Sequence, residues 1–175
     1  HGLGACGLKW VAGFVKNRQY DLPNVTGVQI FNDTKTGIPL AIMDCSYLTG
    51  LRTAAVSTVA AKYCSRADAK TLALVGCGFE GTMHLKFFAD LLPSLQEIRL
   101  YDIAQPASVA LREAARHYFR GEIRVCNDPK TCLEGADIIS TCTNGDVHII
   151  QPEWFQAGTF GVGIEGGCAY TAEAL

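Results

Sequence analysis

The segment that most constrains the fold of this chain is "LALVGCGFEG", residues 72–81. Its apolar run ends in three glycines with G-x-G-x-x-G spacing, and a helical pattern begins near Phe79. A buried strand, a glycine turn and a helix in direct succession form the first half of a βαβ unit. The segment therefore predicts an α/β domain with a parallel sheet.

The same alternation continues along the rest of the chain. Nearly all-apolar strands are expected at residues 71–76, 97–102, 122–126, 137–142 and 158–164, with helices at 79–92, 106–119 and 129–136. Strands that are apolar at every position are buried on both faces of a sheet. The part of the chain after Asp68-Ala69 is therefore predicted to form a doubly wound parallel sheet.

The first third of the chain has a different pattern. Strands are expected at 9–15, 27–33 and 38–44, and Thr36-Gly37 is a plausible hairpin turn between the last two. Apolar residues at helical spacing follow over 49–66. The chain therefore has two differently patterned parts, and this expected helix leads from the first into the second. The chain starts without Met and ends on "TAEAL", which resembles a helix just beginning, so we expect a fragment.

Composition narrows the functional classes. With 49% hydrophobic residues, 18% charged residues and a net charge of −2, the 175-residue chain is typical of a globular protein, and nothing indicates a nucleic-acid partner. No apolar stretch has the length of a membrane span, and the first residues lack the pattern of a signal peptide. Eight scattered cysteines without metal-ligand spacing indicate reduced thiols in a cytoplasmic protein and no metal site.

The glycine loop has the properties of a dinucleotide cradle. Gly76 would make the tight turn, Gly78 would let the backbone approach a pyrophosphate, and Gly81 would let the helix pack on the strand. Phe79 and Glu80 open that helix, whose N-terminus would face the phosphates. Glu80 either lies in solvent, favoured by the helix dipole, or points inward and weakens cofactor binding.

An acid stands at the position that this cofactor site requires. Asp102 ends the second strand of the unit, 21 residues after Gly81, where its carboxylate can accept the ribose hydroxyls. The next residues are Ile103 and Ala104, so no basic side chain is present for a 2′-phosphate, and NAD is favoured over NADP. Thr143 follows a later strand and belongs either to the nicotinamide side of the site or to an ordinary turn.

Two basic residues are candidates for the chemistry. Lys9 stands beside the apolar run "WVAGF", where a partly dry lysine could handle protons, although a surface lysine at a strand start is the alternative. Arg52 could clamp a carboxylate, or form a surface ion pair. His84 and His117 lie in helical patterns, where satisfied surface or core histidines are expected.

Together these segments resemble the ornithine cyclodeaminase/mu-crystallin family. The likeness covers nearly the whole chain and is strongest from Lys9 to Leu85, including "GLKWVAGF", "LPNVTGVQIFNDTKTGIPLAIMD" and "LTGLRTAAVSTVAAKYCSRADAKTLALVGCGFEG". The resemblance implies part of an α+β substrate and dimerisation domain at 1–50, a linking helix at 51–68, an NAD-binding Rossmann-type domain at 69–165 and the start of a return to the substrate domain at 166–175. For the complete chain it implies a homodimer. By position, Lys9 would be the catalytic or substrate-polarising lysine. Arg52 would bind the substrate carboxylate, and Thr53 the cofactor phosphate.

One departure from the family pattern leaves the reaction open. Alignment through Gly158-Thr159 places Gly167 where cyclodeaminases carry a catalytic Asp, and Glu165 would point elsewhere. The leading hypothesis is an NAD-dependent amino-acid dehydrogenase or imine reductase acting on a small amino or imino acid. Ornithine cyclodeamination to proline and ammonia is one alternative, and a non-catalytic NAD-binding or ligand-storage protein is the other.

Overall fold

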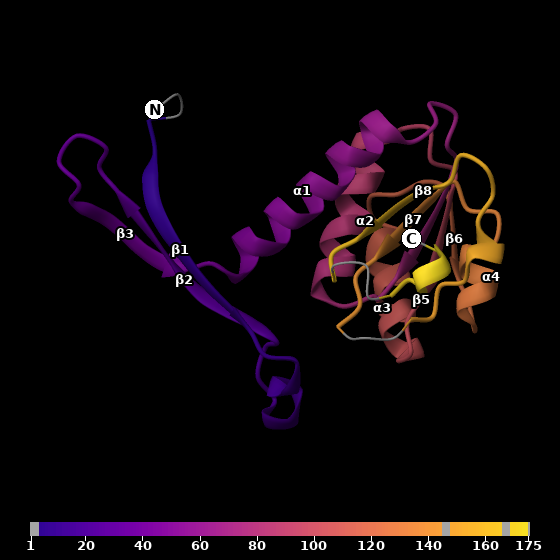
Figure 1. Cartoon of the computed structure of the whole chain (residues 1–175), viewed down its shortest axis with the longest axis horizontal. Helices are drawn as coiled ribbons and strands as arrows, with labels where there is room; N and C mark the ends of the chain where they lie inside the picture. Colours follow the sequence, from indigo (N-terminus) through magenta and orange to yellow (C-terminus); the bar gives the residue numbers. More distant parts are fainter. Residues whose placement is uncertain (1–3, 145–147, 166–168, 175) are drawn as a thin grey trace. The chain divides into compact units, whose positions relative to one another are not determined.

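The computed structural model describes residues 4–144, 148–165 and 169–174 (Figure 1). The chain divides into two compact units, residues 1–51 and 52–175. Each unit is described by itself below.

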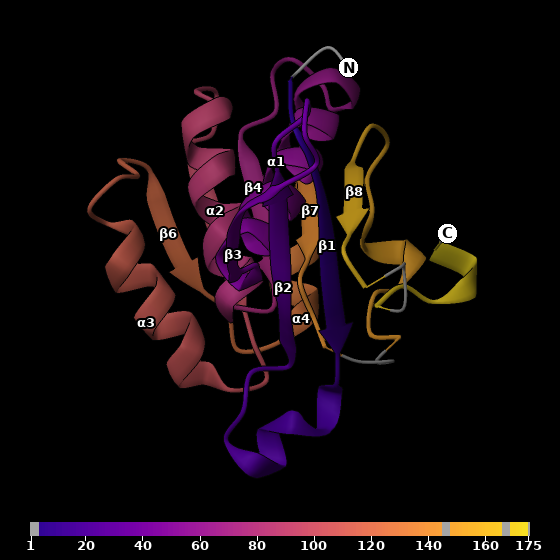
Figure 2. The same cartoon turned by 90° about the vertical axis from the view of Figure 1, so that its left-hand side faces the viewer.

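The first unit is an antiparallel sheet of β1 (Cys6–Gly13), β2 (Val25–Asn32) and β3 (Pro39–Asp44), in that order (Figure 2). The hairpin predicted at Thr36-Gly37 is confirmed. Its turn is closed by Asp33, whose backbone oxygen accepts from Gly37 N–H at 2.9 Å and whose side chain accepts from Thr36 N–H at 2.7 Å. Gly37 has φ +76°, a conformation that glycine adopts without strain.

The structure corrects the predicted limits of the first strand. β1 ends at Gly13, and residues 15–20, which include the end of the predicted strand, form the 3-10 helix η1 (Val15–Tyr20). Phe14 N–H donates to the Asn24 oxygen at 2.7 Å, and the Asn17 amide donates to the Pro23 oxygen at 2.9 Å. These contacts close the connection to β2, and a period-two pattern does not reveal them.

Helix α1 (Ser46–Cys64) begins three residues before the helical pattern at 49–66 and five residues before the expected linking helix at 51–68. The Asp44 carboxylate accepts from both the backbone N–H and the hydroxyl of Ser46, at 2.8 and 3.0 Å. Thr49 Oγ1 donates to the Cys45 oxygen at 2.7 Å. An acid that accepts from the free N–H groups of a first turn stabilises a helix start.

The second unit contains a five-stranded, fully parallel sheet, which confirms the predicted doubly wound fold. The strand order is β6-β5-β4-β7-β8. The strands are β4 (Thr71–Val75), β5 (Glu97–Tyr101), β6 (Glu122–Val125), β7 (Ile138–Thr141) and β8 (Phe160–Gly163). The chain first adds strands on one side of β4 and then crosses to the other, so the order reverses between β4 and β7. Ligands of such sheets bind outside the carboxyl ends of the strands at this reversal.

Helical layers cover both faces of this sheet. Successive strand residues point to opposite sides, so apolar side chains on each face pack against a separate layer. Leu72 and Leu74 face a buried cluster that includes residues of α1, α2 (Phe79–Leu91) and α3 (Gln105–Ala115). Ala73 and Val75 face a second cluster with α4 (Pro129–Leu133) and residues 149–155. The remaining described elements are the 3-10 helices η2 (Pro152–Trp154) and η3 (Ala172–Ala174). The second of these lies where the sequence suggested the beginning of a helix.

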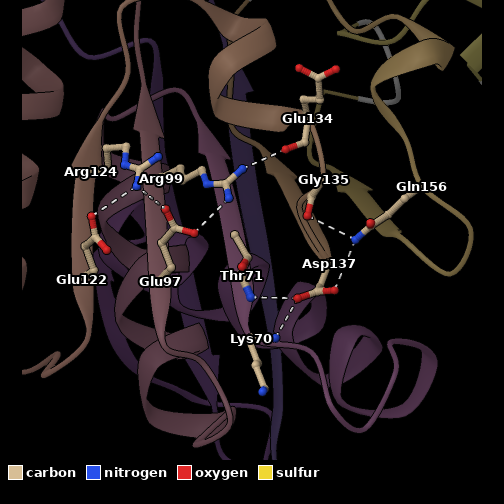
Figure 3. Close-up of polar contacts among 10 residues, drawn as sticks. All are labelled: Lys70, Thr71, Glu97, Arg99, Glu122, Arg124, Glu134, Gly135, Asp137 and Gln156. Carbon is tan, nitrogen blue, oxygen red and sulfur yellow. Dashed lines mark hydrogen bonds and ion pairs between the residues drawn. The ribbon is translucent and has the colours of Figure 1, made fainter.

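Polar contacts fasten the amino-terminal edge of the sheet (Figure 3). The buried Asp137 carboxylate accepts from the backbone N–H groups of Lys70 and Thr71, at 2.8 and 3.0 Å, just before β4. It also pairs with Arg66 at 2.5 Å. Asp137 therefore fixes the start of β7 against the start of β4, the two strands that flank the reversal.

Candidate functional site

The glycine loop between β4 and α2 is held open by close backbone packing. Gly76 has φ +93°, and a Cβ there would lie 2.5 Å from the Cys142 oxygen. A Cβ on Gly81 would overlap the Gly76 carbonyl oxygen, whereas one on Gly78 would meet no atom within 4 Å. Two of the glycines are thus required by the protein's own packing. Gly78 leaves its side of the loop free for close approach by a ligand.

Asp102 lies at the carboxyl end of β5 and contacts this loop directly. Its Oδ2 accepts from Cys77 N–H at 2.7 Å, and its Oδ1 accepts from Ala104 N–H at 2.8 Å. The residue therefore makes a turn before α3 and also reaches the glycine loop. A carboxylate has about four acceptor positions, so these two bonds leave capacity for ribose hydroxyls.

The entrance of α2 is suited to an anion. Gly78 is the N-cap residue, and no side chain caps the first turn. Helix N-terminal N–H groups carry partial positive charge and bind phosphates. Burial, with a smaller contribution from Asp102, raises the pKa of the Cys77 thiol to about 12, and the Ser108 hydroxyl opposes the shift. The loop thus carries no thiolate that would repel a pyrophosphate.

One interpretation of the sequence placed the Glu80 side chain in solvent, but the structure shows it largely covered. Its side chain is 24% exposed, and its Oε2 is 3.9 Å from Nδ1 of the fully buried His84. The expected satisfied histidine is found: Nδ1 also contacts the Glu80 backbone oxygen at 2.8 Å, and Nε2 contacts Ser57 Oγ at 3.0 Å. The acid is thus turned back along α2 toward the histidine.

A second polar group lies at the carboxyl ends of β7 and β8. Thr141 Oγ1 donates to the Glu165 carboxylate, and the Thr143 hydroxyl is buried. Burial raises the pKa of Glu165, opposed by the Thr141 hydroxyl and by the backbone N–H groups of Glu165, Thr143 and Ile164. Glu165 therefore turns toward β7, and its ionisation is disfavoured. Gly167, the position expected to replace the family's acid, lies outside the described residues.

Lys9 lies on β1 in the first unit, directly opposite Gln29 on β2, which in turn faces Met43 on β3. Cross-strand neighbours of this kind have Cβ atoms about 5 Å apart on the same face of the sheet. Lys9 and Gln29 are both partly buried. The Gln29 amide oxygen is buried and has no hydrogen-bond partner among the described residues. A polar pair therefore shares this face of the sheet.

Comparison with known proteins decides the family. The model of the ornithine cyclodeaminase/mu-crystallin family matches residues 1–174. The chain belongs to this family. Over 165 residues it is 36% identical to ornithine cyclodeaminase of Agrobacterium fabrum, covering 93% of this chain and 46% of the relative. It is 31% identical over 167 residues to alanine dehydrogenase of Archaeoglobus fulgidus, covering 91% and 48% respectively.

A solved relative extends the likeness to three dimensions. The structure of Thermococcus litoralis Δ1-pyrroline-2-carboxylate reductase, in complex with NADH and L-proline, superimposes with a TM-score of 0.87 at 28% identity. The match covers 97% of this chain and 54% of the reductase. This ornithine cyclodeaminase/mu-crystallin family member spans about half the length of the curated relatives that it matches.

Most of the residues predicted for the cofactor site of this family member lie around one edge of the sheet. The loop glycines, Phe79 and Glu80 lie between β4 and α2, Asp102 binds the loop, and Thr143 N lies 3.2 Å from the Cβ position of Gly76. Arg52 and Thr53 are on α1, where Arg52 is exposed and Thr53 partly buried. Lys9 belongs to the other compact unit.

Sequence reasoning missed two polar contacts and one cross-strand pairing of this family member. The contacts are Thr141 with Glu165 and His84 with Ser57, and the pairing sets Lys9 opposite Gln29; all three join segments far apart in the sequence. Only the strand-pair register could have indicated the last of them. Over the described ranges, no cluster of three or more His, Cys, Asp or Glu could hold a metal ion. The same ranges contain no helix that is long and apolar enough to cross a membrane.

Proposed function

We propose that this protein is an NAD-dependent enzyme of amino-acid metabolism that interconverts an imine and the corresponding amine of a small amino or imino acid. The observation that carries the proposal is the hydrogen bond from Cys77 N–H to Asp102, which sets a carboxylate against an open glycine loop where the strand order reverses. Family relatives that reduce pyrroline-2-carboxylate or dehydrogenate alanine support the reaction class.

The residues of the loop fit this cofactor. Among the described residues, and apart from its own chain neighbours, no atom lies within 4 Å of a Cβ placed on Gly78, and α2 presents its first turn without a side-chain cap. Asp102 would hold the adenosine ribose and would repel a 2′-phosphate, which favours NAD over NADP. Thr53 would contact the phosphates, and Thr143 would lie on the nicotinamide side. When bound, the cofactor would supply or accept the hydride.

The remaining roles fall to basic residues of this chain. Lys9 would give a proton to, or polarise, the substrate nitrogen or carbonyl, and Arg52 would hold the substrate carboxylate in bidentate fashion. Gln29 lies opposite Lys9 and would offer a buried amide to the same substrate. In the reductive direction, the C=N bond takes one hydride and one proton to become an amine.

A homodimer in the cytoplasm is part of the proposal. One face of the three-stranded sheet carries large apolar side chains that are strongly exposed, including Leu8 at 58%, Trp10 at 70% and Ile42 at 71%. Apolar patches of this kind mark association surfaces. The archaeal alanine dehydrogenase of this family was solved as a dimer with bound NAD. All seven cysteines among the described residues are free thiols, in keeping with a reducing compartment.

The decisive experiment measures net cofactor turnover and ammonia together. The purified protein is supplied with NADH and a panel of cyclic imines and of 2-oxo acids with ammonium, and NADH oxidation is followed by absorbance. Oxidation that depends on the substrate supports the proposal. Ammonia release from ornithine without net change in NADH would replace it with cyclodeamination. NADH binding without turnover of any substrate would contradict the proposal and support a non-catalytic, ligand-storage protein.

A further inference from the structure

His84 is buried at a junction between two helices. Its side chain is fully inaccessible to solvent and lies in the second turn of α2. Nδ1 is 2.8 Å from the backbone oxygen of Glu80, and Nε2 is 3.0 Å from the hydroxyl of Ser57 on α1. This single imidazole therefore contacts the first turn of α2 and the middle of α1 together.

These partners fix the proton on the ring. A backbone carbonyl only accepts, so Nδ1 must donate to Glu80, and in the neutral ring Nε2 must then accept from the Ser57 hydroxyl. Burial lowers the pKa of His84, opposed by the hydrogen bond to the Glu80 backbone. The neutral Nδ1–H tautomer is therefore the form that satisfies both contacts.

The two ends of this contact lie beside the proposed cofactor site. Glu80 is the second residue of α2, two residues after the N-cap Gly78, which lies on the free side of the loop. Ser57 lies one turn after Thr53 on α1, and residues four apart share one face of a helix. The imidazole thus connects the turn expected to face the pyrophosphate with the helix face that carries Thr53.

We propose that His84 is a positioning residue that holds the first turn of α2 against α1 through Ser57, and so sets the affinity of the glycine loop for a dinucleotide pyrophosphate. The inference rests on the proposed function, because it requires that the loop bind NADH. It assigns His84 no contact with substrate or cofactor.

The first test is spectroscopic and needs no activity. Nitrogen chemical shifts of the His84 ring, recorded by NMR at neutral pH, should show a protonated Nδ1 and an unprotonated Nε2. The Ser57→Ala variant should alter the Nε2 shift while Nδ1 stays protonated. A ring protonated at Nε2 in the wild-type protein would overturn the inference, because Nε2 could not then accept from Ser57.

The second test separates positioning from packing. Gln places its amide near the position of Nε2 and can keep the contact with Ser57, whereas Asn reaches only the position of Nδ1. The dissociation constant for NADH, measured by fluorescence titration, should rise about tenfold in His84→Asn and in Ser57→Ala, and at most about threefold in His84→Gln. The double variant Ser57→Ala/His84→Asn should lose little more than either single variant, because both remove one contact.

Thr58→Val is the matched control. Thr58 is buried next to Ser57, but its hydroxyl donates within α1, to the Ala54 oxygen at 2.8 Å. The Thr58→Val variant should have a lower melting temperature than the wild type and an unchanged dissociation constant for NADH. The inference would be overturned if the control weakened NADH binding as much as Ser57→Ala does, or if His84→Asn bound NADH with wild-type affinity. Either result would leave the proposed function standing. Absence of NADH binding by the wild-type protein would overturn the proposed function and this inference with it.

Discussion

The Asp102 carboxylate accepts a hydrogen bond from the backbone N–H of Cys77, with 2.7 Å between Oδ2 and N. This contact joins the end of β5 to the glycine loop that follows β4. The same side chain therefore shapes the loop and keeps acceptor capacity beyond its two bonds to backbone N–H groups. In the proposed function it would also bind the adenosine ribose, so that loop geometry and cofactor choice would depend on one residue.

Replacing Asp102 with Ala should weaken NADH binding by about tenfold or more, because charge-assisted hydrogen bonds contribute about 1.5–3 kcal/mol. The preference for NADH over NADPH should narrow, since the charge that repels a 2′-phosphate is lost. Fluorescence titration with both cofactors measures the change. Asp128→Ala is the control, because Asp128 caps α4 through Thr131 N–H at 2.8 Å and does not touch the glycine loop. Unchanged NADH affinity in Asp102→Ala would remove this residue from the site.

The loop glycines offer a test of packing against binding. Gly81→Ala should destabilise the fold, because its Cβ would overlap the Gly76 backbone oxygen. Gly78→Ala should keep most of the thermal stability, because its Cβ meets no protein atom within 4 Å, yet it should weaken NADH binding at least tenfold. Thermal melts and NADH titrations on both variants measure these effects. Full NADH affinity in a folded Gly78→Ala protein would contradict the expected close approach of the pyrophosphate.

The sequence predicted the elements that carry local signals. The run "LALVGCGFEG" and Asp102 at the end of the next apolar strand were enough to predict the parallel sheet, the glycine loop and the position of Asp102 at the end of its strand. The start of α1 was missed because it depends on Asp44 binding Ser46, which apolar periodicity does not show. The 3-10 helix η1 was also missed, because the hydrogen bonds that close its connection to β2 leave no mark on the apolar pattern.

Contacts between distant segments set the limit of prediction within the site. The orientation of Glu80 toward His84, and of Glu165 toward Thr141, depends on how elements pack after they form. Residues 24 apart, such as Thr141 and Glu165, carry no sequence signal that pairs them. The family resemblance supplied Thr53 and the specific roles of Lys9 and Arg52, and all of these roles stay predictions.

Glu165 should make stability depend on pH in a specific direction. Its pKa is raised in the folded state by burial, so the native protein holds this proton more tightly than the unfolded chain. The stability it contributes is fully present below its ordinary pKa of about 4.5 and is lost as pH rises through the raised value. Glu165→Gln stays neutral and can still accept from Thr141. The melting temperature of this variant, relative to that of the wild type, should therefore increase from pH 4 to pH 8. Thermal melts of both proteins at pH values about one unit apart measure the difference. A constant difference across this range would contradict the assignment.

Asp137 should be a stability residue with little effect on cofactor binding. Its carboxylate accepts from the Lys70 and Thr71 N–H groups at the amino edge of the sheet (Figure 3). It also pairs with Arg66. Asp137→Ala leaves buried donors without an acceptor and should lower the free energy of unfolding by about 3 kcal/mol. Urea denaturation measures this loss. Asp68→Ala, which removes only an exposed partner of Arg66, should cost less than about 1 kcal/mol. Equal losses in the two variants would show that the buried bonds contribute little.

Lys9 should separate chemistry from cofactor binding. Lys9→Met keeps the apolar stem of the side chain and removes the ammonium that would give a proton to the substrate. Substrate-dependent NADH oxidation should fall at least a hundredfold, because positioned acid–base groups contribute about 10²–10⁴ to rate. The dissociation constant for NADH should stay within about twofold, since the glycine loop is unaltered. Lys35→Met is the control, because Lys35 lies in the exposed hairpin turn. Full turnover in Lys9→Met would defeat the catalytic role, and a loss of NADH binding with it would show that Lys9 acts through the cofactor site instead.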